Sequence, residues 1–122
     1  MASTDKYTRI EQAEYLRLDC PGRPGKLPLA MIRLGQHNGL WAAAIEFHQM
    51  MGDCWGMGEP LGIYNGNTSR LFRTRSEAVN DAAARMLEKI YGRPVLMAAQ
   101  IAWAKSLQSK PGDQMTLFGE VA

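Results

Sequence analysis

Two cysteines and two histidines are the side chains of this chain best suited to hold a metal ion or to act as nucleophile and base. Cys20, His37, His48 and Cys54 are separated in sequence by 17, 11 and 6 residues. The chain contains no Cys-x-x-Cys and no His-x-x-x-His pair, which are the spacings typical of zinc modules. We therefore expect no metal ion and no other cofactor.

Cys54 is the strongest candidate nucleophile. His48 or His37 would be its base, and Asp53 or Glu46 would orient that base, as in enzymes with a nucleophile–base pair. Nothing in the spacing of these residues requires this arrangement, and the glycines around Cys54 lack the Gly-Lys-Ser/Thr of a phosphate-binding loop. We predict a protein without enzymatic activity, with a Cys54-based activity as the alternative.

Four arginines, Arg33, Arg70, Arg73 and Arg75, are candidates for binding nucleic acid. Residues 62–122 carry eight Lys/Arg against five Asp/Glu, so the second half of the chain is the more basic. Arg73 and Arg75 lie where a helix is expected to begin, and the first amides and the dipole of a helix favour phosphate. This segment is loosely similar to the sheet-to-helix junction of double-stranded-RNA-binding domains and of the DNA-binding domains of some integrases, which implies DNA or RNA as a partner. The alternative is an ordinary solvated face.

Large, soft side chains gather in the glycine-rich segment of residues 50–59. Met51, Trp55 and Met57, with Asp53 among them, form a candidate surface for a protein partner, because methionines adapt to the surfaces that they meet. A host defence protein, such as a nuclease complex blocked by a phage or plasmid inhibitor, is a partner that this surface would suit. The alternative is that the segment covers one end of a sheet.

The segment near the C-terminus reads Gln114-Met115-Thr116-Leu117-Phe118. It resembles the pentapeptide by which bacterial proteins of DNA metabolism dock on the replicative sliding clamp. The glutamine, leucine and phenylalanine match that motif, Met115 stands where leucine is commonest, and Thr116 fills the small polar position. The resemblance implies that the clamp is a partner and that the protein acts in DNA replication or repair, in a bacterium or in a mobile element such as a phage or plasmid. The alternative is that Met115, Leu117 and Phe118 pack on the protein's own core.

Turn signals and alternating patterns organise the expected sheet. Strands are expected over residues 29–34, 40–49, 60–64 and 70–72. Asn38-Gly39 and Asn65-Gly66 are expected to form tight turns, because both residue types tolerate a positive φ. Residues 50–59 are expected to form a loop because they are rich in glycine.

Helical patterns occur in three places. Helices are expected over residues 8–18, 75–91 and 94–107. Thr74 and Glu77 have the spacing of a capping box, and Gly92 fits the stop position of the same helix. For the first segment a strand through residues 15–18 is the alternative, and residues 21–25 are a loop because they hold two prolines and two glycines.

Length and composition indicate one globular domain. The 122 residues are 46% hydrophobic and 21% charged, which suffices for a single core. No apolar run approaches the roughly 20 residues of a membrane helix, and the first residues lack an apolar signal core, so we expect a cytoplasmic protein with no membrane partner. Two cysteines are too few for a disulfide scaffold, and we expect both thiols to be reduced.

Together these patterns predict an α+β protein. An antiparallel sheet of three or four strands is packed by one long helix and followed by a second helix and a flexible C-terminal tail. We expect a single domain over residues 1–107, with residues 1–7 frayed, and the tail over residues 108–122. The broad apolar face of the second helix makes a homodimer a further expectation. The predicted function is docking on the sliding clamp, with nucleic-acid binding and inhibition of a host defence protein as alternatives.

Overall fold

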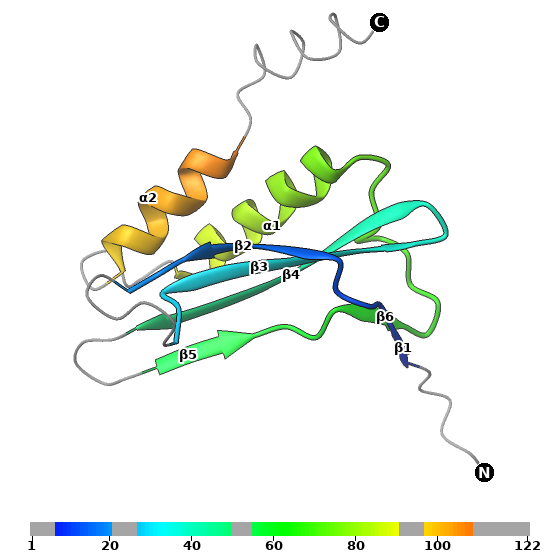
Figure 1. The fold of residues 1–122 in the computed structure, drawn as a ribbon, viewed down its shortest axis with the longest axis horizontal. Coiled ribbons are helices and arrows are strands. Elements are labelled where there is room, and N and C mark those ends of the chain that lie inside the picture. The colour runs from blue at the N-terminus through cyan, green and yellow to red at the C-terminus, as the bar shows by residue number, and fades with distance from the viewer. Residues whose placement is uncertain (1–6, 21–26, 50–54, 91–96, 109–122) are drawn as a thin grey trace, which may run out of the picture.

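The computed structural model describes residues 7–20, 27–49, 55–90 and 97–108. It has β1 (Tyr7–Arg9), β2 (Glu14–Leu18), β3 (Ala30–His37), β4 (Leu40–Gln49), β5 (Trp55–Gly58), β6 (Gly62–Tyr64), α1 (Arg75–Ile90) and α2 (Ala98–Leu107). Strands β2-β3-β4-β5 form an antiparallel sheet, and β1 and β6 form a separate two-stranded ribbon. Both helices cover one face of the larger sheet (Figure 1). The expected α+β class is confirmed.

The β3–β4 hairpin is the centre of the sheet. Its register pairs Ile32 with Ile45 and His37 with Leu40, so the connection is only two residues long. Asn38 and Gly39 have φ of 52° and 80°, the positive values that a type I′ turn needs. The turn is where the sequence predicts it, and β3 extends to His37, three residues beyond the predicted strand.

The larger core lies between the helices and the sheet. Alternate side chains of β3 and β4 point into it, as the pattern of residues 40–49 predicted, and Ile32, Ile45 and Phe47 are fully buried. Helix α1 contributes mainly small residues, and its Ala82 and Ala83 have no exposed surface. Because alanine side chains are short, α1 can approach β4 closely.

A second, smaller core lies on the other face of β4. Ala42 and Ala44 are buried there against Leu61, which precedes β6, and Ile63 of β6, and against Ile10, which follows β1. Strand β4 is therefore buried on both faces along half of its length. The β1–β6 ribbon and the chain beside it cover this half of β4.

The prediction of a helix over residues 8–18 is wrong. Strands β1 and β2 occupy this segment, and the alternative of a strand through residues 15–18 agrees with β2. Ile10 packs in the smaller core, whereas Leu16 packs against the larger one, so a single helical stripe cannot serve both. Pairing with β3 and burial on opposite faces outweigh a modest helical propensity.

The structure corrects three further predictions, all of which concern strands. Residues 55–58 of the expected loop form β5, which pairs with residues 46–49 of β4. The strand expected over residues 60–64 shortens to β6 and joins β1 in place of the larger sheet. The strand expected over residues 70–72 reduces to a single bridge between Phe72 and Trp41. The partners of β6 and of Phe72 are distant in sequence, so local patterns carry no information on these two pairings. Strand β5 pairs with the nearby end of β4, but its two glycines give it a weak strand pattern.

Helix α1 begins with the predicted capping box. The amide of Glu77 donates to Oγ1 of Thr74, and the amide of Thr74 donates to Oε1 of Glu77, both at 3.1 Å. The helix begins at Arg75 as expected, and residue 91 lies outside the described residues.

Helix α2 is described from Ala98, so the expected start at residue 94 also lies outside the described residues. In the part of the chain that is described, no helix has the length and apolar character needed to cross a membrane.

Replacing Thr74 with alanine is expected to lower the free energy of unfolding by about 1 kcal/mol, because the amide of Glu77 at the start of α1 loses its capping hydroxyl. Thr74→Ser keeps the hydroxyl and should retain most of the stability. Urea denaturation of both variants measures the difference. Equal stability of the alanine and serine variants would show that the capping box contributes nothing.

Candidate functional site

Strand β4 has an outer edge that other strands cover only in part. Strand β5 pairs with residues 46–49, and Phe72 bridges Trp41 at the opposite end. Between them, no strand of the described residues pairs with residues 42–45 on this side. An uncovered stretch of strand leaves backbone donors and acceptors that need partners when they are buried.

Side chains replace the missing strand at this edge. The amide of Ile45 donates to Oε1 of Glu59 at 3.1 Å, and Nη2 of Arg85 donates to the carbonyl oxygen of Ala43 at 3.0 Å. The amide of Glu59 donates to the carbonyl oxygen of Ile45 at 2.9 Å. The carboxylate and the guanidinium therefore continue the hydrogen-bonding pattern of the sheet where β5 ends.

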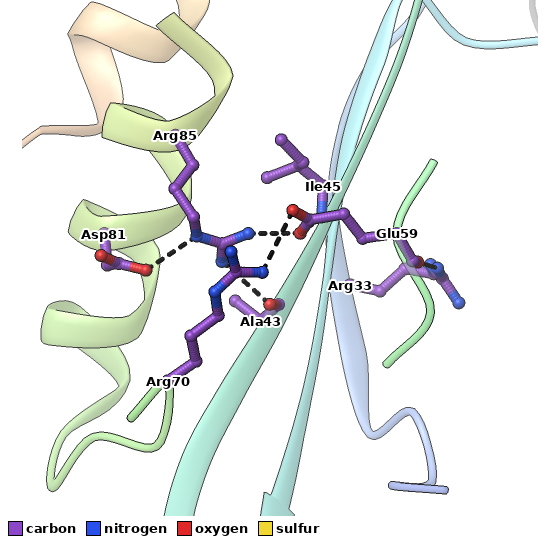
Figure 2. Close-up of polar contacts among 7 residues, drawn as sticks. All are labelled: Arg33, Ala43, Ile45, Glu59, Arg70, Asp81 and Arg85. Atoms are coloured by element: carbon purple, nitrogen blue, oxygen red, sulfur yellow. Dashed lines mark hydrogen bonds and ion pairs between the residues drawn. The ribbon is translucent and has the colours of Figure 1, made fainter. Parts of the chain in front are cut away.

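The same two side chains form the centre of a charged cluster (Figure 2). Nη1 of Arg85 forms an ion pair with Oε1 of Glu59, and the two side chains are each 13% exposed. Nε of Arg85 lies 2.9 Å from Oδ2 of Asp81, one turn earlier in α1. Nη1 of Arg70 lies 3.4 Å from Oε2 of Glu59. We call Glu59, Arg70, Asp81 and Arg85 the Glu59 cluster.

Arg85 stays charged in this setting. Burial alone would lower the pKa of Arg85, but its hydrogen bonds to Glu59 and Asp81 and their negative charges raise that pKa above its ordinary value. The cavity beside the cluster, lined by Asn67, Arg70 and Leu71 among others, has a volume of about 40 Å³. That volume suits a few water molecules and no substrate. The contacts of the Glu59 cluster are thus those of a structural ion pair.

The four arginines predicted to bind nucleic acid do not form one surface. Arg33 donates from Nη2 to the backbone carbonyl of Glu59, on the side of that residue away from Arg70 and Arg85 (Figure 2). Arg70 pairs with the carboxylate of Glu59, and Arg75 pairs with Glu14 of β2. Arg73 is exposed. Carboxylates therefore offset Arg70 and Arg75, and nucleic-acid binding by this set stays a prediction.

Two residues of the alternative catalytic arrangement, His48 and Glu46, contact each other on β4. Nε2 of His48 lies 3.1 Å from Oε2 of Glu46, on the helix-free face of the sheet. A Cβ at Gly56 would overlap the His48 ring, so glycine at this position of β5 makes room for the imidazole. Cys54 and Asp53 lie outside the described residues. His37 ends β3 at the other end of the hairpin, with Nε2 3.3 Å from Nδ2 of Asn38, so it does not join His48.

The predicted partner-binding segment is divided by the structure. Met57 lies in β5 and packs against the larger core, which agrees with the alternative that the segment covers one end of the sheet. The backbone of Trp55 begins β5, and Met51 and Asp53 lie outside the described residues.

In helix α2, Gln100 and Ala104 are buried while other positions remain exposed, so a homodimer through this helix stays a prediction.

Two other expectations concern residues of which the structure describes little. Among the described residues no three His, Cys, Asp or Glu side chains gather as a metal site would require. Cys20 is a free thiol, as expected. The terminal pentapeptide, residues 114–118, lies outside the described residues, so its docking on a clamp is untested.

The pairing of Glu59 with Arg85 was not predicted from the sequence. The two residues are 26 positions apart, and the loop assigned to residues 50–59 gave no reason to bury Glu59. One signal was available, because Asp81 and Arg85 have the i, i+4 spacing of a helical ion pair beside the apolar stripe of α1.

Comparisons with known proteins add no further information on this site. No protein-family profile matches the chain, and neither curated proteins nor solved structures give a match.

Proposed function

We propose that this protein is a non-enzymatic accessory protein of DNA replication or repair that docks on the bacterial sliding clamp through residues 114–118. The single observation that carries the proposal is the pentapeptide Gln114-Met115-Thr116-Leu117-Phe118 close to the C-terminus. A bacterial mobile element, such as a phage or plasmid, is the source that we propose for a small protein with such a motif.

The geometry of α2 supports a docking segment after it. The helix ends at Leu107, and Gln108 has the extended backbone angles φ −76° and ψ 128°. The C-terminal end of α2 points away from the sheet (Figure 1). The pentapeptide begins at Gln114, six positions after Gln108, and six residues span at most about 22 Å. The motif is thus tethered within a short reach of the domain.

Two apolar side chains of the pentapeptide would supply part of the binding free energy. Burial of Leu117 and Phe118 in an apolar pocket of the clamp would contribute roughly 3–6 kcal/mol. Ordering of the segment takes back a few kcal/mol, and hydrogen bonds from Gln114 fix the register. A micromolar dissociation constant corresponds to about 8 kcal/mol, so the contacts of Gln114, Met115 and the backbone would have to supply the remainder.

Calorimetric titration of the intact protein into a purified bacterial sliding clamp tests the proposal. We expect micromolar binding, and we expect Leu117→Ala with Phe118→Ala to weaken it by about 10- to 100-fold, which corresponds to roughly 1.4–3 kcal/mol. Met115→Leu introduces the residue that is commonest in the motif and should bind at least as tightly as the natural sequence.

Two results would overturn clamp docking. One is the lack of any heat of binding from the intact protein at concentrations well above micromolar. The other is equal binding by the alanine variant, which would place the contact outside residues 114–118. Unfolding curves for all three proteins provide the control, because none of the substitutions falls in the described core and all should be equally stable.

A further inference from the structure

A groove of about 290 Å³ lies on the helix-free side of the larger sheet. Strand β1, the chain that crosses from β1 to β2, and residues 60–61 before β6 form its walls, and Arg33 of β3 lines it from the sheet. Tyr7, Arg9 and Gln12 contribute the other polar groups. We call this feature the Arg33 groove. Its volume lies at the small end of the range for ligand sites in proteins.

The guanidinium of Arg33 has unused capacity to bind an anion. Its Nη2 donates to the backbone carbonyl of Glu59, which is a neutral acceptor. Its Nε is buried and has no hydrogen-bond partner among the described residues. No carboxylate of those residues forms an ion pair with Arg33, since the side chain of Glu59 is engaged by Arg70 and Arg85. A phosphate in the groove would balance this charge and accept hydrogen bonds from the guanidinium.

Arg9 supplies a second positive charge to the same groove. It lies in β1 opposite Gly62 of β6 and is exposed. Glu11 lies beside Arg9 in an adjoining hollow, but no ion pair joins them, and Arg9 has none with any other residue that the structure describes. Two guanidinium groups therefore line one groove without a carboxylate between them, in contrast to Arg70, Arg75 and Arg85.

Exposed aromatic rings surround the groove. Tyr7 lies against Gly62, where a Cβ would overlap the ring, and its hydroxyl donates to the carbonyl oxygen of Leu61 at 3.0 Å. The centroid of the Tyr64 ring is 4.8 Å from that of Tyr7. Tyr15 pairs with Arg33 in the β2–β3 register and lies on the same face of the sheet. Tyr7, Tyr15 and Tyr64 are 41%, 54% and 55% exposed, although tyrosine side chains of a small domain are ordinarily more buried.

We propose that the Arg33 groove and these tyrosines form a binding site for single-stranded nucleic acid. Arg9 and Arg33 bind backbone phosphates, and bases stack on the exposed rings of Tyr15 and of the Tyr7–Tyr64 pair. Interleaved arginines and aromatic rings are typical of surfaces that bind single strands, because every base offers a face for stacking. A duplex keeps its bases stacked on one another and so cannot use the rings. This site differs from the helix-start patch of Arg70, Arg73 and Arg75.

Fluorescence anisotropy with a labelled oligo-deoxythymidine of about 12 nucleotides tests this site. We expect the intact protein to bind the single strand more tightly than a duplex of equal length. The logarithm of the binding constant should fall with the logarithm of the salt concentration with a slope of about −1.4, the value for two phosphates of a single strand. Tyr15→Ala should weaken binding by roughly 5-fold or more. Arg9→Gln should weaken binding several-fold and make the salt slope shallower. Arg33 is left unchanged because its contact with Glu59 supports the fold.

Control variants separate this site from its alternatives. Lys89→Gln removes the same charge as Arg9→Gln from the exposed last turn of α1, and it should bind as the natural protein does. Leu117→Ala with Phe118→Ala should also bind the oligonucleotide normally, so failure of clamp docking and failure of this site are distinguishable. The proposal is overturned if the intact protein does not bind, if the duplex binds more tightly, or if Arg73→Gln weakens binding while Arg9→Gln does not.

Discussion

Replacing Arg85 with methionine is expected to lower the free energy of unfolding by about 3–5 kcal/mol, the loss that follows when one partner of a buried ion pair is removed. The substitution leaves the carboxylate of Glu59, with a side chain only 13% exposed, without its closest positive charge. It also removes the donor to the carbonyl oxygen of Ala43 at the open edge of β4. A domain of ordinary stability, about 5–15 kcal/mol, would lose a large share of it.

Arg75→Met is the matched control for this experiment. Arg75 lies in the same helix and also pairs with a glutamate, Glu14, but the two side chains are 43% and 40% exposed. Exposed ion pairs contribute about 0–1 kcal/mol, so the control should unfold at nearly the natural urea concentration. Equal losses from Arg75→Met and Arg85→Met would contradict the structural role assigned to the Glu59 cluster.

A double variant identifies the source of the loss. Glu59→Gln keeps an acceptor for the amide of Ile45 but removes the charge. If the cost of Arg85→Met comes from an unpaired buried carboxylate, then the double variant Glu59→Gln with Arg85→Met should be more stable than the sum of the single losses implies. Strict additivity would mean that the two residues act independently.

The parts of the fold that are encoded locally could be predicted from the sequence. The capping box of Thr74 and Glu77 and the helical stripe that follows define α1 within a stretch of consecutive residues. Asn38-Gly39 defines the turn between β3 and β4, because few other pairs accept a positive φ at both positions. In each case the residues that decide the structure are neighbours in the chain.

The parts that depend on distant partners could not be predicted. Residues 8–18 carry a mixed pattern, and their division into β1 and β2 depends on β6 and β3, which are contributed by later segments. The partners of Arg33 and Arg85 are both 26 positions away. Sequence patterns singled out Arg33 for its charge but missed Arg9, because only the folded chain brings β1 beside β3.

The crossing of the chain from β1 to β2 leads to a prediction that concerns both fold and site. Gly35 in β3 is buried directly beneath this crossing. A Cβ at this position would overlap the carbonyl oxygen of Glu11 and would lie 2.8 Å from Cγ2 of Ile10. The obstacle is backbone, which cannot rotate away as a flexible side chain does. Gly35→Ala is therefore expected to lower the free energy of unfolding by about 1–3 kcal/mol.

Gly58→Ala is the control for Gly35→Ala, because both glycines lie in strands of the same sheet. A Cβ at Gly58 would meet Cγ of Glu46 at 3.8 Å, an ordinary contact, so the variant should be as stable as the natural protein. The two variants should also differ in oligonucleotide binding, because Ile10 and Gln12 of the displaced crossing line the Arg33 groove. If Gly35→Ala were as stable as Gly58→Ala, then the crossing would not be packed against β3. If Gly35→Ala were destabilised but still bound the oligonucleotide normally, then the groove would not depend on the position of this crossing.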